Sequence, residues 1–362
     1  MTWDELTDGL RRSGVLSEEW EVPFRALPRS RFTPARIYHA GEWIDQGTDP
    51  ARWCELVCTD QPLVTQLYEG TEMPSSSSSM PTVVATMLHH LDVADRTRVL
   101  EVGTGTGWTA ALLSHRLGGD KVVSIEVDPE LAAQARARLD AMGLRPRVVT
   151  GDGMIGDPAG APFQRIHLTA AVQRVPGALI EQCEPGGVIL APYGTALCNG
   201  ALARLTVAAD GRSAAGPFVA DVAFMWVRDQ RPDSGEFSID TVRYSASEVD
   251  PADFADNTDA AFAIGLRVPG LFRQSVWASY DRFGTGRFEV WDGTSYAHCR
   301  LADWLGDHAV SQSGPRNLWE EVTAAYRWWQ HRDRPHLSRL GLTVTVAGEH
   351  RAWLDEPGNV IG

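Results

Sequence analysis

Cysteine is scarce in this sequence, with five residues in a chain of 362. The number is odd and no pair has C-x-x-C spacing. Cys54 and Cys58 have no further histidine or cysteine nearby to complete a tetrahedral metal site. We therefore expect reduced thiols and no bound metal.

Positive charge and long hydrophobic runs are also lacking. The chain has 33 Lys and Arg against 47 Asp and Glu residues, a formal net charge of -14 at pH 7. This disfavours a nucleic-acid partner, because phosphate binding needs clustered Lys and Arg. No stretch approaches the roughly 18 apolar residues of a membrane-spanning helix, and the N-terminus lacks the basic and apolar regions of a signal peptide. We expect a cytoplasmic protein without a membrane partner.

The most informative segment that is present is a glycine-rich turn. Residues 99–102 form a short apolar run that is typical of a strand buried in a parallel sheet. Gly103, Gly105 and Gly107 then allow a tight turn and close approach of the backbone to a ligand, before a helix begins near Trp108. Glu126 ends the next apolar strand, where a carboxylate can accept both hydroxyl hydrogen bonds of a ribose.

Two details favour S-adenosylmethionine (AdoMet) over a dinucleotide. The glycines follow G-x-G-x-G and not G-x-G-x-x-G, and Glu101 immediately precedes them. A carboxylate there would repel a pyrophosphate but attract a sulfonium. Asp152, between two glycines after a third apolar segment, suits the adenine amino group. NAD binding and a plain glycine turn without a nucleotide remain the alternatives.

The segments before this turn are harder to interpret. Residues 23–34 indicate a turn-rich connection, whose arginines we expect to be solvated or locally paired, and residues 52–81 an irregular arm. The serine run 75–79 has the composition of a flexible linker. Pro81, however, begins a segment with apolar residues at helical spacing, which places the serines at a helix N-terminus that favours an anion.

Alternation of strands and helices predicts an α/β fold that is divided into four parts. These are an N-terminal helical segment and arm (1–80), an AdoMet-binding core (81–228), an acidic connection (229–260) and a C-terminal accessory domain (261–362). His167, within a predicted central strand, is expected to be a packed core residue.

The order of the motifs resembles the protein-L-isoaspartate O-methyltransferase family over roughly residues 4–226. The resemblance depends on segments 10–14, 26–32, 60–63, 79–81, 101–107, 151–153, 169–171, 176–180 and 185–187. It implies a Rossmann-like class I AdoMet-dependent methyltransferase sheet with helices on both faces, plus a smaller α+β C-terminal domain. It also implies AdoMet as cofactor, S-adenosylhomocysteine as product and a peptide or protein substrate.

The resemblance also assigns site residues. Residues implied in cofactor binding are Ser77, Glu101, Gly103, Thr104, Gly105, Gly107, Glu126, Val127, Asp152, Gly153 and Thr169. Ser79 is implied to lie between the methyl donor and the substrate carboxylate, with Ser78 beside it as a catalytic residue. Residues implied in substrate binding are Asp60, Leu63, Val64, Thr65 and Ser79.

The chain departs from the family pattern in three places. It has only serines where the family usually has Gln-Thr-Ile-Ser, it has Phe163-Gln164 in place of a Tyr-Asp pair, and it continues well beyond Phe224. Extended members look like actinobacterial methyltransferases of lanthipeptide and graspetide clusters. Those enzymes methylate an ordinary Asp of a ribosomally made, modified peptide, which leads to an aspartimide.

Three functions follow from this pattern. We expect methylation of an Asp in such a peptide, with residues 230–362 helping to hold it. Repair of isoaspartyl residues in damaged proteins is the alternative, and a binding-only protein is the third hypothesis.

Overall fold

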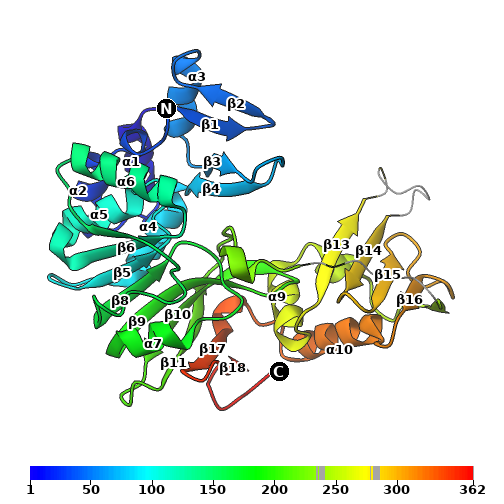
Figure 1. Cartoon of the computed structure of the whole chain (residues 1–362). Helices are drawn as coiled ribbons and strands as arrows, with labels where there is room; N and C mark the ends of the chain where they lie inside the picture. The colour runs from blue at the N-terminus through cyan, green and yellow to red at the C-terminus, as the bar shows by residue number, and fades with distance from the viewer. Residues whose placement is uncertain (234, 236–240, 278, 280–285, 362) are drawn as a thin grey trace.

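The structure is a computed structural model that describes residues 1–233, 235, 241–277, 279 and 286–361 (Figure 1). These residues form three sheets with helices packed around them. In Figure 1 the N-terminal elements lie above the large sheet, and the smaller C-terminal sheet projects to one side.

The large sheet has nine strands and carries the predicted AdoMet core. Their order is β18 (His350–Leu354), β17 (Leu340–Thr345), β11 (Ser213–Ala220), β10 (Asn199–Val207), β9 (Cys183–Gly194), β8 (Phe163–Leu168), β5 (Val99–Val102), β6 (Val122–Glu126) and β7 (Arg147–Thr150). Strands β5 to β9 pair in parallel, whereas β10, β11, β17 and β18 add antiparallel strands. The chain leaves β5 for β6 on one side and returns to β8 on the other. This reversal creates a crevice at the carboxyl ends of the strands, where ligands bind in such sheets.

Helices cover both faces of this sheet, so the predicted fold class is confirmed. One core contains residues of α1 (Trp3–Arg12), α2 (Glu18–Ala26), α4 (Pro81–Leu91) and α5 (Trp108–Leu117). The other core contains residues of α7 (Gly177–Gln182), α9 (Thr258–Arg267) and α10 (Leu318–His331). His167 of β8 is 1% exposed, as predicted for a packed histidine.

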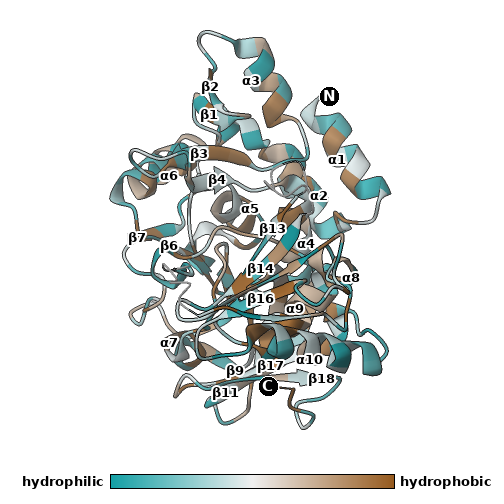
Figure 2. Ribbon diagram, turned by 90° about the vertical axis from the view of Figure 1, so that its right-hand side faces the viewer, coloured by the Kyte–Doolittle hydropathy of each residue, from teal (hydrophilic) through white to brown (hydrophobic). Residues whose placement is uncertain are grey.

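Local sequence signals explain several of these helices. Thr2 and Glu5 form the capping box that starts α1, whose alternating hydropathy is visible in Figure 2. Asp128 caps α6 (Pro129–Ala141), and Pro129 occupies its first turn. Trp108 donates its indole hydrogen bond to Leu27 O at 2.9 Å, which fixes the N-terminal helices against α5.

The prediction of an irregular arm over residues 52–81 is wrong. This part of the chain contains α3 (Pro50–Val57) and contributes to a four-stranded sheet of order β2 (Glu42–Asp45), β1 (Arg36–His39), β3 (Leu63–Leu67) and β4 (Pro74–Ser78). The serine run is therefore an edge strand and not a linker. Strand β4 is held by backbone pairing with β3 rather than by apolar side chains.

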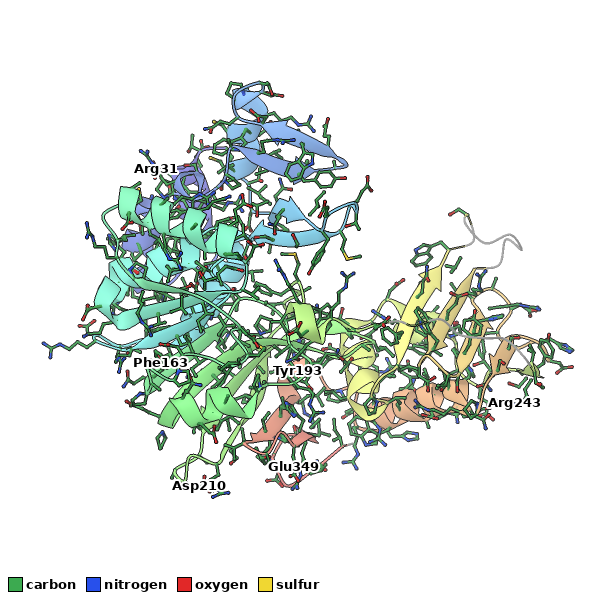
Figure 3. The ribbon with its side chains drawn as sticks, in the orientation of Figure 1. Arg31, Phe163, Tyr193, Asp210, Arg243 and Glu349 are labelled. Atoms are coloured by element: carbon green, nitrogen blue, oxygen red, sulfur yellow. The ribbon has the colours of Figure 1, made fainter. Side chains whose placement is uncertain are left out.

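The C-terminal part contains a five-stranded antiparallel sheet. Its order is β12 (Arg243–Ser245), β16 (Val310–Ser313), β15 (Tyr296–Arg300), β14 (Arg287–Trp291) and β13 (Phe272–Val276). Figure 3 shows Arg243 of this sheet far from Phe163 of the large sheet. Short elements complete the described chain: α8 (Ala252–Ala255), η1 (Arg29–Arg31), η2 (Gly119–Lys121), η3 (Arg228–Gln230) and η4 (Leu337–Arg339).

Sheet membership differs in two ways from the predicted division into four parts. Strands β17 and β18 were assigned to the accessory domain, but β17 pairs with β11 of the large sheet. The acidic connection contains α8 and β12, and β12 pairs with β16 of the C-terminal sheet. Its residues Glu236 and Asp240 lie outside the described residues. The division into four folding units stays a prediction.

Membrane spans, metal sites and disulfides bear on the class of protein. Among the described residues, no helix is both long and apolar enough to cross a membrane. Within the same residues, no three His, Cys, Asp or Glu side chains are grouped so that they could hold a metal ion. All five cysteines are free thiols.

Candidate active site

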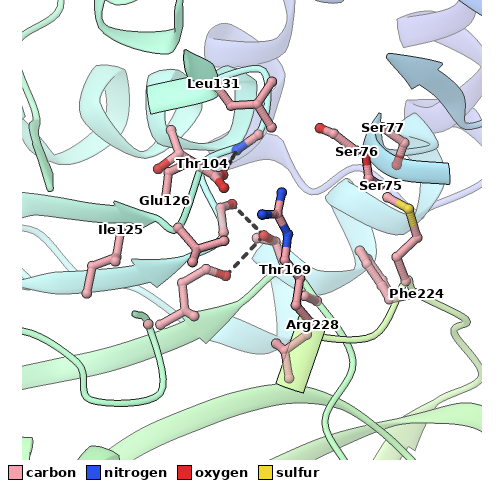
Figure 4. Close-up of a pocket in the computed structure, with 18 of the residues that line it drawn as sticks. Ser75, Ser76, Ser77, Thr104, Ile125, Glu126, Leu131, Thr169, Phe224 and Arg228 are labelled. Atoms are coloured by element: carbon pink, nitrogen blue, oxygen red, sulfur yellow. Dashed lines mark hydrogen bonds between the residues drawn. The ribbon is translucent and has the colours of Figure 1, made fainter. Parts of the chain in front are cut away.

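A cavity of about 270 Å³ lies at the carboxyl ends of β5, β6 and β8 (Figure 4). Five segments supply most of its lining: 75–79 from the serine strand, 102–109 from the glycine turn except Gly107, 125–127 from the end of β6, 152–154 after β7, and 224–229. Leu131, Thr169 and Ala170 complete the wall. The cavity therefore lies at the crevice that the sheet topology creates.

The glycine turn is shaped by left-handed backbone and by one threonine. Gly103 has φ +100°, and a Cβ atom there would collide with Thr169 Oγ1. Thr169 Oγ1 donates a hydrogen bond to Gly103 O at 2.5 Å, so this close approach holds the turn against the end of β8. Gly107 does not line the cavity. It leaves room for Ala135 of α6, whose Cβ would lie 3.3 Å from a Cβ on Gly107.

Glu126 is placed as the sequence predicts, at the cavity wall. Its side chain is 7% exposed, and Oε2 accepts a hydrogen bond from Gly105 N at 2.8 Å. Oε1 accepts a second bond from Asp128 N at 3.1 Å. Each carboxylate oxygen has a further lone pair, so Glu126 can support the turn and still accept hydrogen bonds from ribose hydroxyls.

Glu101 does not lie where the sequence analysis expected. It is fully buried beneath the turn and does not line the cavity. Its Oε2 accepts a hydrogen bond from Ser124 Oγ at 2.5 Å, and Ser124 Oγ is also hydrogen-bonded to Thr104 Oγ1 at 2.6 Å. Burial raises the pKa of Glu101 to about 8, so the group is largely protonated at pH 7. Glu101 thus supports the turn through Ser124 and Thr104, and it does not place a negative charge in the cavity next to a sulfonium.

The opposite wall includes a segment that the sequence analysis missed. Asp152 and Gly153 line the cavity as predicted, and Met154 joins them. Residues 224–229 lie beside the end of β8, because Ala171 N donates to Met225 O at 2.8 Å and Val227 N donates to Ala171 O at 2.9 Å. None of residues 224–229 was among the site residues predicted from the sequence.

The serine strand forms the third side of the cavity. Ser77, Ser78 and Ser79 all line it. Ser78 is 2% exposed, and its Oγ finds no hydrogen-bond partner in the part of the chain that the structure describes. A buried hydroxyl that is left unpaired in this way is costly, and a ligand that accepts a hydrogen bond would relieve the cost.

A polar bridge joins the serine strand to the core. Ser75 Oγ donates to Gln66 Oε1 at 2.8 Å, and Gln66 Nε2 donates to Asp128 Oδ2 at 3.3 Å. Arg228 also donates to Asp128 Oδ2, at 3.2 Å. Burial opposes ionisation of Asp128, but hydrogen bonds from Leu131 N, Gln66 and Arg228 lower its pKa overall. The bridge therefore holds a carboxylate and a guanidinium at the rim of the cavity.

The four residues 60 and 63–65, predicted to bind substrate, do not line the cavity. Asp60 instead accepts hydrogen bonds from Thr82 N at 2.9 Å and Thr82 Oγ1 at 2.5 Å, and so caps the start of α4. Leu63 is 1% exposed and belongs to the small core of the N-terminal sheet. Val64 and Thr65 lie in β3, behind the serine strand. Because Asp60 already occupies Thr82 N, that group of the α4 N-terminus is not available to an anion.

The residues around the cavity fit AdoMet. The glycine turn, Glu126 and the pair Asp152 and Gly153 line the same cavity as the buried Ser78, and they offer close backbone approach, a carboxylate for ribose hydroxyls and an acid for an adenine amino group. Together with the strand order, this defines the class as an AdoMet-dependent methyltransferase of the class I fold.

Comparison with known proteins assigns the family. The family model for protein-L-isoaspartate(D-aspartate) O-methyltransferase (PCMT) matches residues 2–231, and the chain belongs to this family. Protein-L-isoaspartate O-methyltransferase 1 of Anaeromyxobacter sp. (strain Fw109-5) is 50% identical over 190 residues, which cover 52% of this chain and 76% of the relative. The protein-L-isoaspartate O-methyltransferase of Xanthobacter autotrophicus is 42% identical over 139 residues, covering 37% of this chain and 63% of the relative.

One solved structure is similar over nearly the whole chain. It is named protein-L-isoaspartate O-methyltransferase, covers 98% of this chain and 100% of its own, and has a TM-score of 0.57 at 20% identity. The match shows a shared fold that extends beyond residue 231.

Proposed function

We propose that this chain transfers the AdoMet methyl group to the carboxylate of L-isoaspartyl and D-aspartyl residues in damaged proteins and peptides. The observation that carries the proposal is the extent of the family match. Every residue that lines the cavity falls between Ser75 and Asp229, inside the matched region 2–231. The whole candidate site thus belongs to the part of the chain that resembles protein-L-isoaspartate O-methyltransferases.

Methyl transfer to a carboxylate needs no acid or base catalysis. AdoMet, when bound, supplies an electrophilic methyl group on a sulfonium. A substrate carboxylate is already ionised at pH 7, so the protein needs no general base and no histidine or cysteine nucleophile. What it must provide is alignment of the carboxylate and removal of water from it. The hydroxyls of Ser78 and Ser79 are the groups that we assign to this task.

Replacing Ser79 with alanine is expected to lower kcat about tenfold, because one hydrogen bond to a charged carboxylate is lost. Ser78→Ala is expected to have a similar effect, since its hydroxyl has no hydrogen-bond partner among the residues that the structure describes. AdoMet affinity should stay within about twofold in both variants. Steady-state kinetics with an isoaspartyl peptide and calorimetric AdoMet titration measure the two quantities. Ser17→Ala, away from the cavity, is the matched control. Unchanged kcat in both cavity variants would remove the serines from the mechanism.

The decisive test of the function uses the full chain, AdoMet and a pair of peptides that differ only in an L-isoaspartyl or L-aspartyl linkage. Mass spectrometry is expected to detect one added methyl group on the isoaspartyl peptide alone. A panel of isoaspartyl peptides of unrelated sequence should also be accepted. Failure to methylate any of them would overturn the proposal.

A second candidate is methylation of an ordinary Asp in a ribosomally made, modified peptide, followed by closure to an aspartimide. Two observations favour it: residues 232–362 lie outside the family match, and the serine run replaces the usual family sequence. The first has limited weight, because the solved structure of similar fold also covers the C-terminal part. Methylation of the modified peptide with loss of methanol, and no reaction with isoaspartyl peptides, would favour this candidate.

A shortened chain cannot decide between these candidates. Strand β17 pairs with β11, and α9 and α10 contribute buried residues to the same core as β8 and β9. Removing everything after Val227 would therefore expose the interior of the large sheet. The comparison must be made on substrates with the intact protein.

A further inference from the structure

Arg29 is a fully buried cation outside the cavity. The arginines of residues 23–34 were expected to be solvated or locally paired. For Arg29 this expectation is wrong, since its side chain is 0% exposed. Burial lowers its pKa to about 10, so the guanidinium is still protonated at pH 7. Burying a charge is expensive unless its hydrogen-bonding groups are satisfied.

Within the described part of the chain, the hydrogen bonds of this guanidinium all go to backbone carbonyls, while the negative charge of Asp60 partly offsets the effect of burial on its pKa. The bonds run to Gln61 O (2.7 Å), Thr59 O (2.8 Å), Val57 O (2.9 Å), Ser79 O (3.1 Å) and Leu56 O (3.3 Å). A guanidinium carries five N–H donors in a fixed plane, so its shape fixes where these carbonyls lie relative to one another.

The carbonyls belong to three segments of the chain, of which the last lines the cavity. Leu56 and Val57 end α3, where carbonyls lack helical partners and a cation is favourable. Gln61 precedes β3, and Ser79 directly follows β4. Arg29 therefore fastens both ends of the β3–β4 hairpin at its base. It thereby holds the backbone of Ser79, which lines the cavity.

We propose that Arg29 is a positioning residue for methyl transfer: its guanidinium sets the position of Ser79 and, through the adjoining peptide, of Ser78. The proposal rests on the function proposed above for these serines. Among the described residues, Arg29 makes no hydrogen bond to the glycine turn or to Glu126, so its effect is predicted to fall on the substrate carboxylate and not on the cofactor.

The test compares Arg29→Lys and Arg29→Gln with Arg31→Lys. Arg31 is exposed on the same 3-10 turn and is the matched control. Lysine has three donors on a single nitrogen and cannot reach all five carbonyls. We expect kcat with an isoaspartyl peptide to fall at least tenfold in both Arg29 variants, with AdoMet affinity within threefold of the unchanged chain. Arg31→Lys should change neither. Guanidinium chloride at a non-denaturing concentration should restore part of the lost rate, which sodium chloride at the same concentration should not.

A second measurement needs no activity. Hydrogen exchange of the unliganded variants should be faster in segments 56–63 and 76–82 and unchanged in segment 101–109. If the unchanged chain methylates no isoaspartyl peptide, the proposed function fails, while this exchange pattern still tests Arg29. The positioning role is overturned if kcat, AdoMet affinity and folded fraction fall in the same proportion, if exchange rises throughout the chain, or if neither Arg29 variant folds.

Discussion

Replacing Glu126 with alanine is expected to weaken AdoMet binding by about 30- to 150-fold. The variant loses hydrogen bonds from two ribose hydroxyls to a carboxylate, on the order of 2 to 3 kcal/mol in total. The structure adds a second reason, since Glu126 Oε2 also accepts the bond from Gly105 N at 2.8 Å. Without this hydrogen bond the glycine turn is less ordered before AdoMet binds, and ordering it on binding reduces the affinity further.

Calorimetric titration of AdoMet measures this effect, and two variants separate its two parts. Glu126→Gln keeps an oxygen for Gly105 N but loses the charge, so its affinity should lie between those of the unchanged chain and the alanine variant. Glu130→Gln, at an exposed position of the α6 first turn, should leave the affinity unchanged. AdoMet affinity in Glu126→Ala within threefold of the unchanged chain would show that Glu126 does not hold the ribose.

Parts of this fold and site were predictable because a local signal determines them. The capping box of Thr2 and Glu5 and the Asp128-Pro129 pair each specify a helix start by hydrogen bonds between neighbouring residues. The three glycines and Glu126 occupy positions that the βαβ geometry brings together, and Glu126 Oε2 accepts a hydrogen bond from Gly105 N there. The glycine turn and Glu126 therefore appear where the sequence placed them.

Other parts depend on contacts that no local pattern records. Serines have low strand propensity, and β4 exists because its backbone pairs with β3. Arginine is seldom fully buried, and the carbonyls that accept the hydrogen bonds of Arg29 belong to residues about 30 to 50 positions away, so no pattern near Arg29 in the sequence indicates its burial. Residues 224–227 are hydrophobic and carry no local sign of a ligand site, but the pairing of Met225 and Val227 with Ala171 brings the segment to the cavity.

Glu101 shows why the face of a strand matters as much as its position. It directly precedes the turn, and on that ground it was expected to face the ligand. All four residues of β5 are buried, because helices cover both faces of the sheet, and so Glu101 points into the protein interior. The group that is bonded to it, Ser124, comes from the neighbouring strand β6.

This burial makes the stability of the protein depend on pH. Glu101 has a pKa of about 8 in the folded chain against 4.5 for an unperturbed glutamate, mainly because burial disfavours the charged form, with the negative charge of Glu126 adding to the effect. Between these two values the folded state holds a proton that the unfolded state releases. The contribution to stability is therefore fully present below pH 4.5 and is lost as the pH rises through 8. A shift of this size corresponds to a loss on the order of 5 kcal/mol, of which about 4 kcal/mol falls between pH 5 and 9.

Glu101→Gln imitates the protonated side chain at every pH, so it should remove this dependence. The free energy of unfolding can be measured with urea at pH 5, 7 and 9. Between pH 5 and 9 it is expected to fall by on the order of 4 kcal/mol more in the unchanged chain than in Glu101→Gln. Glu181→Gln, at an exposed position of α7, should follow the unchanged chain throughout. Because Glu101 does not line the cavity, AdoMet affinity at pH 7 should stay within about threefold. If the free energy of unfolding has the same pH dependence in the unchanged chain and in Glu101→Gln, the Glu101 carboxylate is ionised inside the protein. A large loss of AdoMet affinity in Glu101→Gln would show that Glu101 does contribute to cofactor binding.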